Sequence, residues 1–159
     1  MNRIVKVFTF TCIVLCSGIV LAQESPFVGT WKLDLAKSKF AGAPLPESET
    51  RTVVPQGDAL KVIFDGVGAD GNKFSFSYTT TLDGKAQGIT GAGVPGGADG
   101  YASKRVNTNT YQTTWLRGAK EIGSSRTIVS KDGKVTTITL KATDTTGKPI
   151  SGVTVFEKQ

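Results

Sequence analysis

The sequence predicts an all-β protein, a single antiparallel up-and-down β-barrel of about eight to ten strands. Apolar and polar residues alternate with the period of a strand in segments such as Phe74 to Tyr78 and Val135 to Leu140. Turn signals recur about every 10 residues, and no apolar repeat is sustained at helical spacing. The opening Phe27–Leu33 and the closing Val153–Lys158 both read as strands, which suggests a sheet that closes on itself.

The first 22 residues have the pattern of a cleaved secretory signal. Arg3 and Lys6 form a basic start, and an apolar run from Val7 to Val20 follows. The residues from Val20 to Ala22 suit a signal peptidase, so we expect cleavage before Gln23. The mature chain, residues 23–159, is then one secreted or periplasmic domain.

Two alternatives for this leader are a membrane anchor and a lipoprotein signal. The apolar run is shorter than the roughly 20 residues that a spanning helix needs. Cys12 and Cys16 follow Thr11 and Leu15, where a lipid-attachment motif has Gly, Ala or Ser. A cleaved signal is therefore favoured, and we expect no membrane attachment of the mature form.

Composition excludes several kinds of site. The chain contains no histidine, and its two cysteines both lie in the leader. The mature form therefore has no disulfide, no ordinary zinc, copper, haem or iron–sulfur site and no Ser-His or Cys-His nucleophile. We accordingly expect no metal and no cofactor.

Charge carries less information. The net charge of +6 falls by two when Arg3 and Lys6 are removed. Many lysines stand beside turns, for example Lys85 and Lys134, and none forms a basic cluster with aromatic residues. Because nucleic-acid binding needs such clusters, we expect no nucleic-acid partner, and we expect a monomer.

The strands can be placed in order from alternation and turns. Asp83-Gly84 and Asp132-Gly133 are hairpin signals, because glycine adopts the positive φ of a tight turn. The expected strands span residues 29–35, 49–55, 59–65, 73–82, 85–90, 100–106, 109–117, 121–130, 134–143 and 150–158. Segment 37–48 is expected to be a loop or at most a short helical turn, and the glycine-rich segment 88–100 a mobile loop.

The opening Phe27–Leu33 followed by Ser38-Lys39-Phe40, and the ending Val155–Lys158, resemble the calycins, that is, lipocalins and fatty-acid-binding proteins. The mature chain also resembles small secreted bacterial proteins of lipocalin-like type, on the segments Leu82–Lys85, Lys104–Val106 and Ser130–Lys134. The resemblance implies a β-barrel fold, and it supports this fold more than any particular activity.

Two departures from the fatty-acid-binding proteins matter. Their charged carboxylate clamp on the last strand corresponds here to Thr154 and Phe156, so a neutral or weakly polar ligand is expected rather than a fatty acid. Their two-helix lid after the first strand is replaced by a Pro- and Gly-containing loop.

The resemblance implies that Gly29 and Trp31 form a structural barrel-end motif, with Trp31 as a core plug rather than a ligand contact. Arg126 lies between Ser124 and Ile128 on one strand face, which leaves three interpretations. It stacks on Trp31 as a cation, it faces the interior and orients a polar head group, or it is solvated.

Period-2 spacing places the aromatic residues of each strand on one side. They either fill the core or, in a hollow barrel, line it. The candidate ligand-binding residues are Phe74, Phe76, Tyr78, Tyr111, Trp115 and Arg126.

The aspartates lie beside glycines or in loops, which favours turns over catalysis, and no catalytic residue is predicted. We therefore expect a non-enzymatic protein that binds a small apolar or amphiphilic ligand. The alternative is a structural or interaction module with a filled barrel.

Overall fold

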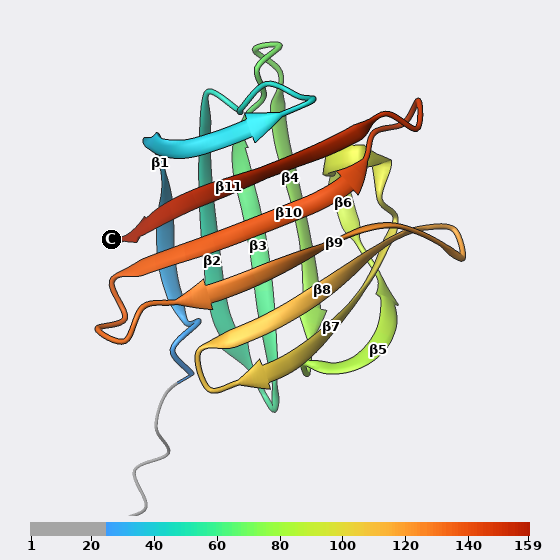
Figure 1. Cartoon of the computed structure of the whole chain (residues 1–159). Coiled ribbons are helices and arrows are strands. Elements are labelled where there is room, and N and C mark those ends of the chain that lie inside the picture. Colours follow the sequence, from blue (N-terminus) through green and yellow to red (C-terminus); the bar gives the residue numbers. More distant parts are fainter. Residues whose placement is uncertain (1–24) are drawn as a thin grey trace, which may run out of the picture.

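Alternating side chains along each strand build one curved antiparallel sheet, which is rolled into a nearly closed barrel in the computed structural model (Figure 1). The structure describes residues 25–159, so the predicted signal 1–22 lies outside the described residues. Within this range no helix has the length and apolar character needed to cross a membrane. The prediction of an all-β antiparallel barrel is confirmed.

The described residues form eleven strands and one 3-10 turn. Strands β7 to β11 and β1 to β4 follow one another as an up-and-down meander, with β5 and β6 at its two edges. The elements are β1 (Gly29–Ala41), β2 (Ser48–Gln56), β3 (Ala59–Val67), β4 (Lys73–Thr80), β5 (Asp83–Gly88), β6 (Thr90–Ala92), η1 (Pro95–Gly97), β7 (Gly100–Asn107), β8 (Thr110–Arg117), β9 (Lys120–Val129), β10 (Val135–Thr143) and β11 (Pro149–Lys158).

The first and last strands pair as predicted, with Trp31 opposite Lys158 and Leu33 opposite Phe156. Strand β1 is longer than expected, because it continues to Ala41 after an irregularity between Asp34 and Lys39. The prediction that residue 37 begins a loop is therefore wrong. Beyond the bulge, the strand bends across the top of the barrel in Figure 1 while still paired with β11.

Local hydrogen bonds hold this bulge. The Ser38 hydroxyl donates to the Asp34 carbonyl at 2.6 Å and accepts from the Val155 amide at 3.0 Å. Lys37 Nζ lies 2.9 Å from Asp34 Oδ2 and 2.6 Å from Glu157 Oε1. The hydrogen bond from Lys37 holds the pKa of Asp34 below its ordinary value. Polar contacts within β1 and with β11, which the apolar pattern does not show, thus accompany the extension of β1 beyond its expected end.

The barrel closes through one segment that changes partners. Residues 83–88 pair with β7, and after Ile89 residues 90–92 pair with β4. Gly91 has a φ of 116°, and a Cβ on it would lie 2.3 Å from the Ser75 carbonyl oxygen. Glycine is therefore required where the chain crosses to the β4 edge. The prediction of a loop over residues 88–100 misses β6 and η1, because a three-residue strand that changes partners leaves no alternating pattern in the sequence.

A tyrosine links β7 to β4, the strands next to the edge strands β5 and β6. Tyr101 of β7 is completely buried, and its hydroxyl donates to the Thr79 carbonyl of β4. Its ring lies 4.2 Å, centroid to centroid, from that of Tyr78. Burial raises the pKa of the Tyr101 phenol to about 12 and raises the pKa of Tyr78 well above its ordinary value.

One end of the barrel is filled by the predicted plug. Trp31 is 2% exposed and its indole nitrogen donates to the Phe27 carbonyl at 3.0 Å. Tyr111 meets the Phe27 ring edge-on at 4.9 Å. Lys158 Nζ lies 5.2 Å from the Trp31 ring centroid, and a Cβ on Gly29 would lie 2.5 Å from Lys158 Cε. Gly29 thus makes room for the cation on the plug, and that cation is Lys158 rather than Arg126.

Candidate ligand-binding cavity

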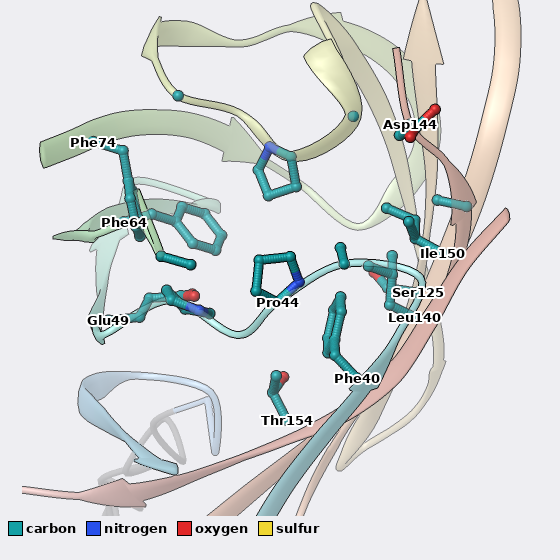
Figure 2. Close-up of a pocket in the computed structure, with 18 of the residues that line it drawn as sticks. Phe40, Pro44, Glu49, Phe64, Phe74, Ser125, Leu140, Asp144, Ile150 and Thr154 are labelled. Carbon is teal, nitrogen blue, oxygen red and sulfur yellow. The ribbon is translucent and has the colours of Figure 1, made fainter. Parts of the chain in front are cut away.

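The opposite end of the barrel holds a cavity of about 460 Å³. The residues around it come from the inner faces of the strands and from the segments 43–46, 68–70 and 93–96. Figure 2 shows Phe64 and Phe74 on one side, Leu140 and Ile150 on the other, and Pro44 between them. Strands β3 and β4 therefore face the hairpin of β10 and β11 across this space.

The wall is mostly apolar. Most of the lining residues are apolar: Phe40, Ala43, Pro44, Pro46, Phe64, Ala69, Phe74, Phe76, Pro95, Trp115, Ile122, Ile138, Leu140, Ala142 and Ile150. A volume of several hundred Å³ with an apolar wall and few polar groups is typical of small-molecule sites.

The register of β3 and β4 forms the aromatic side of the wall. Phe64 lies opposite Phe76, and their rings stack with centroids 4.3 Å apart and an interplanar angle of 12°. Phe74 lies opposite Gly66, where a Cβ would be 2.5 Å from the Phe74 ring carbon Cζ. Gly66 therefore gives the Phe74 ring its place at the mouth.

Trp115 completes this wall from β8. Its indole nitrogen donates to the Ser125 hydroxyl at 3.1 Å, and its ring meets Tyr78 edge-on at 6.1 Å. Both Trp115 and Ser125 line the cavity, whereas Tyr78 is buried behind it. The hydrogen bond satisfies the indole N–H and fixes the ring at the cavity surface.

An ion pair lies within the lining. Arg51 Nε is 2.6 Å from Glu49 Oε1, and the two side chains are 19% and 11% exposed. The Arg51 guanidinium carbon lies 4.7 Å from the Phe64 ring centroid and 4.4 Å from that of Phe156. A pairing partner and two rings thus hold the only cation among the residues that line this cavity.

Backbone contacts brace the mouth. Arg117 Nη2 donates to the Asp144 carbonyl at 3.0 Å and to the Gly96 carbonyl, which joins η1 to the β10–β11 turn. The Asp144 carboxylate accepts from the Thr146 hydroxyl and the Lys148 amide, and these bonds lower its pKa. Asp70 is lowered in pKa by Asn72 in the same way. Both mouth carboxylates are therefore ionised at neutral pH and satisfied within their own turns.

The structure divides the predicted ligand-binding residues. Phe74, Phe76 and Trp115 line the cavity. Tyr78 packs behind the wall, and Tyr111 belongs to the filled end beside Phe27. Period-2 spacing correctly places Phe74, Phe76 and Tyr78 on one inner face, but it carries no information on depth along the barrel axis.

Arg126 does not orient a ligand group in the cavity, and that prediction is wrong. Its side chain is exposed on the outer face of β9, while Ser125 and Thr127 are buried. Apolar Ile128 shares the outer face and is 41% exposed, so at positions 125, 127 and 128 the polar side chains face inward and the apolar one faces outward. The solvated interpretation of Arg126 is the one the structure supports.

Sequence reasoning missed Arg51 and Glu49. Both share the inner face of β2 with buried Val53, as their alternation along the strand requires. The sequence alone did not show this, because Val53 and the neighbouring Val54 lie on opposite faces and only the structure shows that Val53 is the inward one. Among residues 25–159, no group of three or more His, Cys, Asp or Glu side chains is arranged to hold a metal ion.

Comparison with known family models and with curated proteins gives no match. Among solved structures, the chain is similar to a redesigned β-barrel at 12% identity and a TM-score of 0.49, covering 85% of this chain and 93% of that one. It is also similar to a de novo designed fluorescence-activating β-barrel at 12% identity and a TM-score of 0.42, covering 84% and 94%.

Proposed function

We propose that the mature protein is a secreted or periplasmic, calycin-like binding protein that takes a small apolar or amphiphilic molecule into its barrel and performs no catalysis. The observation that carries the proposal is the cavity of about 460 Å³ with its largely apolar wall. Sites that bind small molecules have this size and this character. Secretion rests on the leader pattern of residues 1–22 alone.

The filled-barrel alternative is less well supported. Side chains fill the end around Trp31, where the remaining space is about 20 Å³. The other end leaves more than twenty times that volume between Phe64, Leu140 and their neighbours. A module that works only through its surface has no need of this space, whereas a ligand-binding protein does.

An apolar, environment-sensitive dye tests the proposal. The dye should gain fluorescence with folded protein and be displaced by unlabelled apolar compounds. Leu140→Trp places a bulky ring in the cavity and should abolish the gain. Ile128→Trp, which adds the same ring on the exposed face of the neighbouring strand, should leave it unchanged.

Two outcomes would count against a binding function. The first is that the wild-type protein gives no fluorescence gain at any dye concentration. The second is that Leu140→Trp and Ile128→Trp bind the dye equally well, which would place the dye on the outer surface.

A further inference from the structure

The Arg51–Glu49 pair is the most unusual feature of the cavity, because charged groups are costly to remove from water. The two side chains share the inner face of β2 with Val53. Arg51 Nε lies 2.6 Å from Glu49 Oε1. Phe64 and Phe156 lie on the guanidinium at 4.7 and 4.4 Å. The pair is therefore fixed in position before any ligand arrives.

This pair keeps unused hydrogen-bonding capacity. Only Arg51 Nε and Glu49 Oε1 take part in the bond between them. Among the contacts of residues 25–159, Arg51 Nη1 and Nη2 and Glu49 Oε2 make no hydrogen bond, and none of these atoms is sealed from solvent. Both residues line the cavity, and Arg51 also borders the small space at the filled end, so unused donors and an unused acceptor remain together in the barrel interior.

The balance of charge decides what they accept. The lining has one positively charged residue, Arg51, and three negatively charged residues, Glu49, Asp70 and Asp144. A ligand carboxylate would meet one cation that Glu49 already neutralises. A ligand ammonium placed at the same point would be repelled by Arg51. Beside the Arg51–Glu49 pair, either ion would lose its hydration without gaining an unpaired counter-ion. Asp70 and Asp144 lie in the turns at the cavity mouth and are hydrogen-bonded there.

We propose that the cavity selects an uncharged amphiphile whose polar group both donates and accepts a hydrogen bond, an alcohol or a primary amide. This group sits on the Arg51–Glu49 pair, and the apolar part lies against Phe74, Phe76 and Trp115. The inference rests on the proposed binding function and narrows it to a ligand class. The expected ligand is again neutral, as it is from the sequence, where Thr154 and Phe156 replace a charged clamp.

Displacement of the bound dye by four ten-carbon probes tests this selection: decan-1-ol, decanamide, decanoate and decylammonium at neutral pH, below their aggregation concentrations. The alcohol and the amide should displace the dye at concentrations about tenfold lower than either ion. This ranking needs only the wild-type protein, so no variant has to fold for the test to be decisive.

A charge variant sharpens the test. Glu49→Gln keeps the shape of the side chain but leaves the Arg51 charge without its counter-ion, so decanoate should gain about tenfold relative to decan-1-ol. Asp83→Asn is the matched control, because it removes one negative charge from an exposed pair with Lys85 at 3.1 Å, outside the cavity lining. It should leave the ranking unchanged. A urea titration establishes that each variant is folded.

The outcomes separate this inference from the function beneath it. Tightest binding by decanoate or by decylammonium in the wild type would overturn the selection while leaving a binding function intact. An unchanged ranking of the four probes in folded Glu49→Gln would show that the Arg51–Glu49 pair does not determine which ligand binds. Failure of every probe and of the dye would overturn the proposed function, and the selection with it.

Discussion

The two ends of this barrel are built from the same strands with the same alternation, yet one is filled and the other is hollow. At the filled end Phe27, Trp31 and Tyr111 occupy the interior. At the hollow end the inner positions include small or polar residues such as Ser125 and Thr154, and the large rings stand along the wall. Cavity formation thus depends on the sizes of facing side chains, which differ between the ends although the strand pattern does not.

The two tryptophans of the chain test this contrast most strongly, because one lies at each end. Trp31→Ala should lower the free energy of unfolding by about 3–5 kcal/mol, the usual cost of removing a large buried aromatic side chain. A urea titration measures this loss. A loss below about 1 kcal/mol would show that Trp31 is not a plug.

Trp115→Ala should cost less, about 1–2 kcal/mol and so within the usual range of point mutations, because this ring borders an existing cavity and is only partly buried. The same variant should weaken dye binding several-fold, whereas Trp31→Ala, if folded, should leave it unchanged. Equal stability losses for the two variants would break the distinction between a filled and a hollow end.

High pH probes the region between the ends, where Tyr78 and Tyr101 are buried. Their folded-state pKa values are raised by burial, so the folded protein keeps these protons after the unfolded chain has lost them. Stability should be constant up to about pH 10 and fall as pH rises toward the Tyr101 value of about 12. Urea midpoints measured across this range should show the fall.

Tyr101→Phe removes one of the two groups, so its urea midpoint should decline less steeply above pH 10 than that of the wild type. The variant should also be less stable at neutral pH, because the hydrogen bond from Tyr101 on β7 to the Thr79 carbonyl on β4 is lost. Identical alkaline profiles for the two proteins would assign the decline to other groups.

Arg126→Gln should have the smallest effect. The side chain is exposed on the outer face of β9, so the change in unfolding free energy should stay within about 0.5 kcal/mol. Dye affinity should not change. A several-fold loss of dye affinity in this variant would show that Arg126, rather than Arg51, contributes to the binding site.

Much of the fold could be predicted from sequence because alternation and turn residues specify strands directly. The strands around Phe76 and Ile138 and the pairing of β1 with β11 were accessible in this way. The extension of β1 depends on hydrogen bonds of Ser38, and the crossing at Gly91 depends on a strand that changes partners. Such local irregularities leave no periodic signal.

The site was only partly predictable. Phe74, Phe76 and Trp115 followed from period 2 and aromatic content. Arg126 was misplaced because β9 turns the polar Ser125 and Thr127 inward and Ile128 outward. Hydropathy cannot decide which face of such a strand points into the barrel. Only the register of the strand against β8 and β10 does so.

Amide and aromatic NMR shifts recorded while decan-1-ol is titrated into the protein would locate a bound ligand residue by residue. We expect saturating shift changes at cavity residues such as Arg51, Phe76 and Leu140, and no change at Trp31 and Tyr111 at the filled end. Saturating changes confined to the outer face, or no change at any residue, would contradict a binding cavity in the hollow end of this barrel.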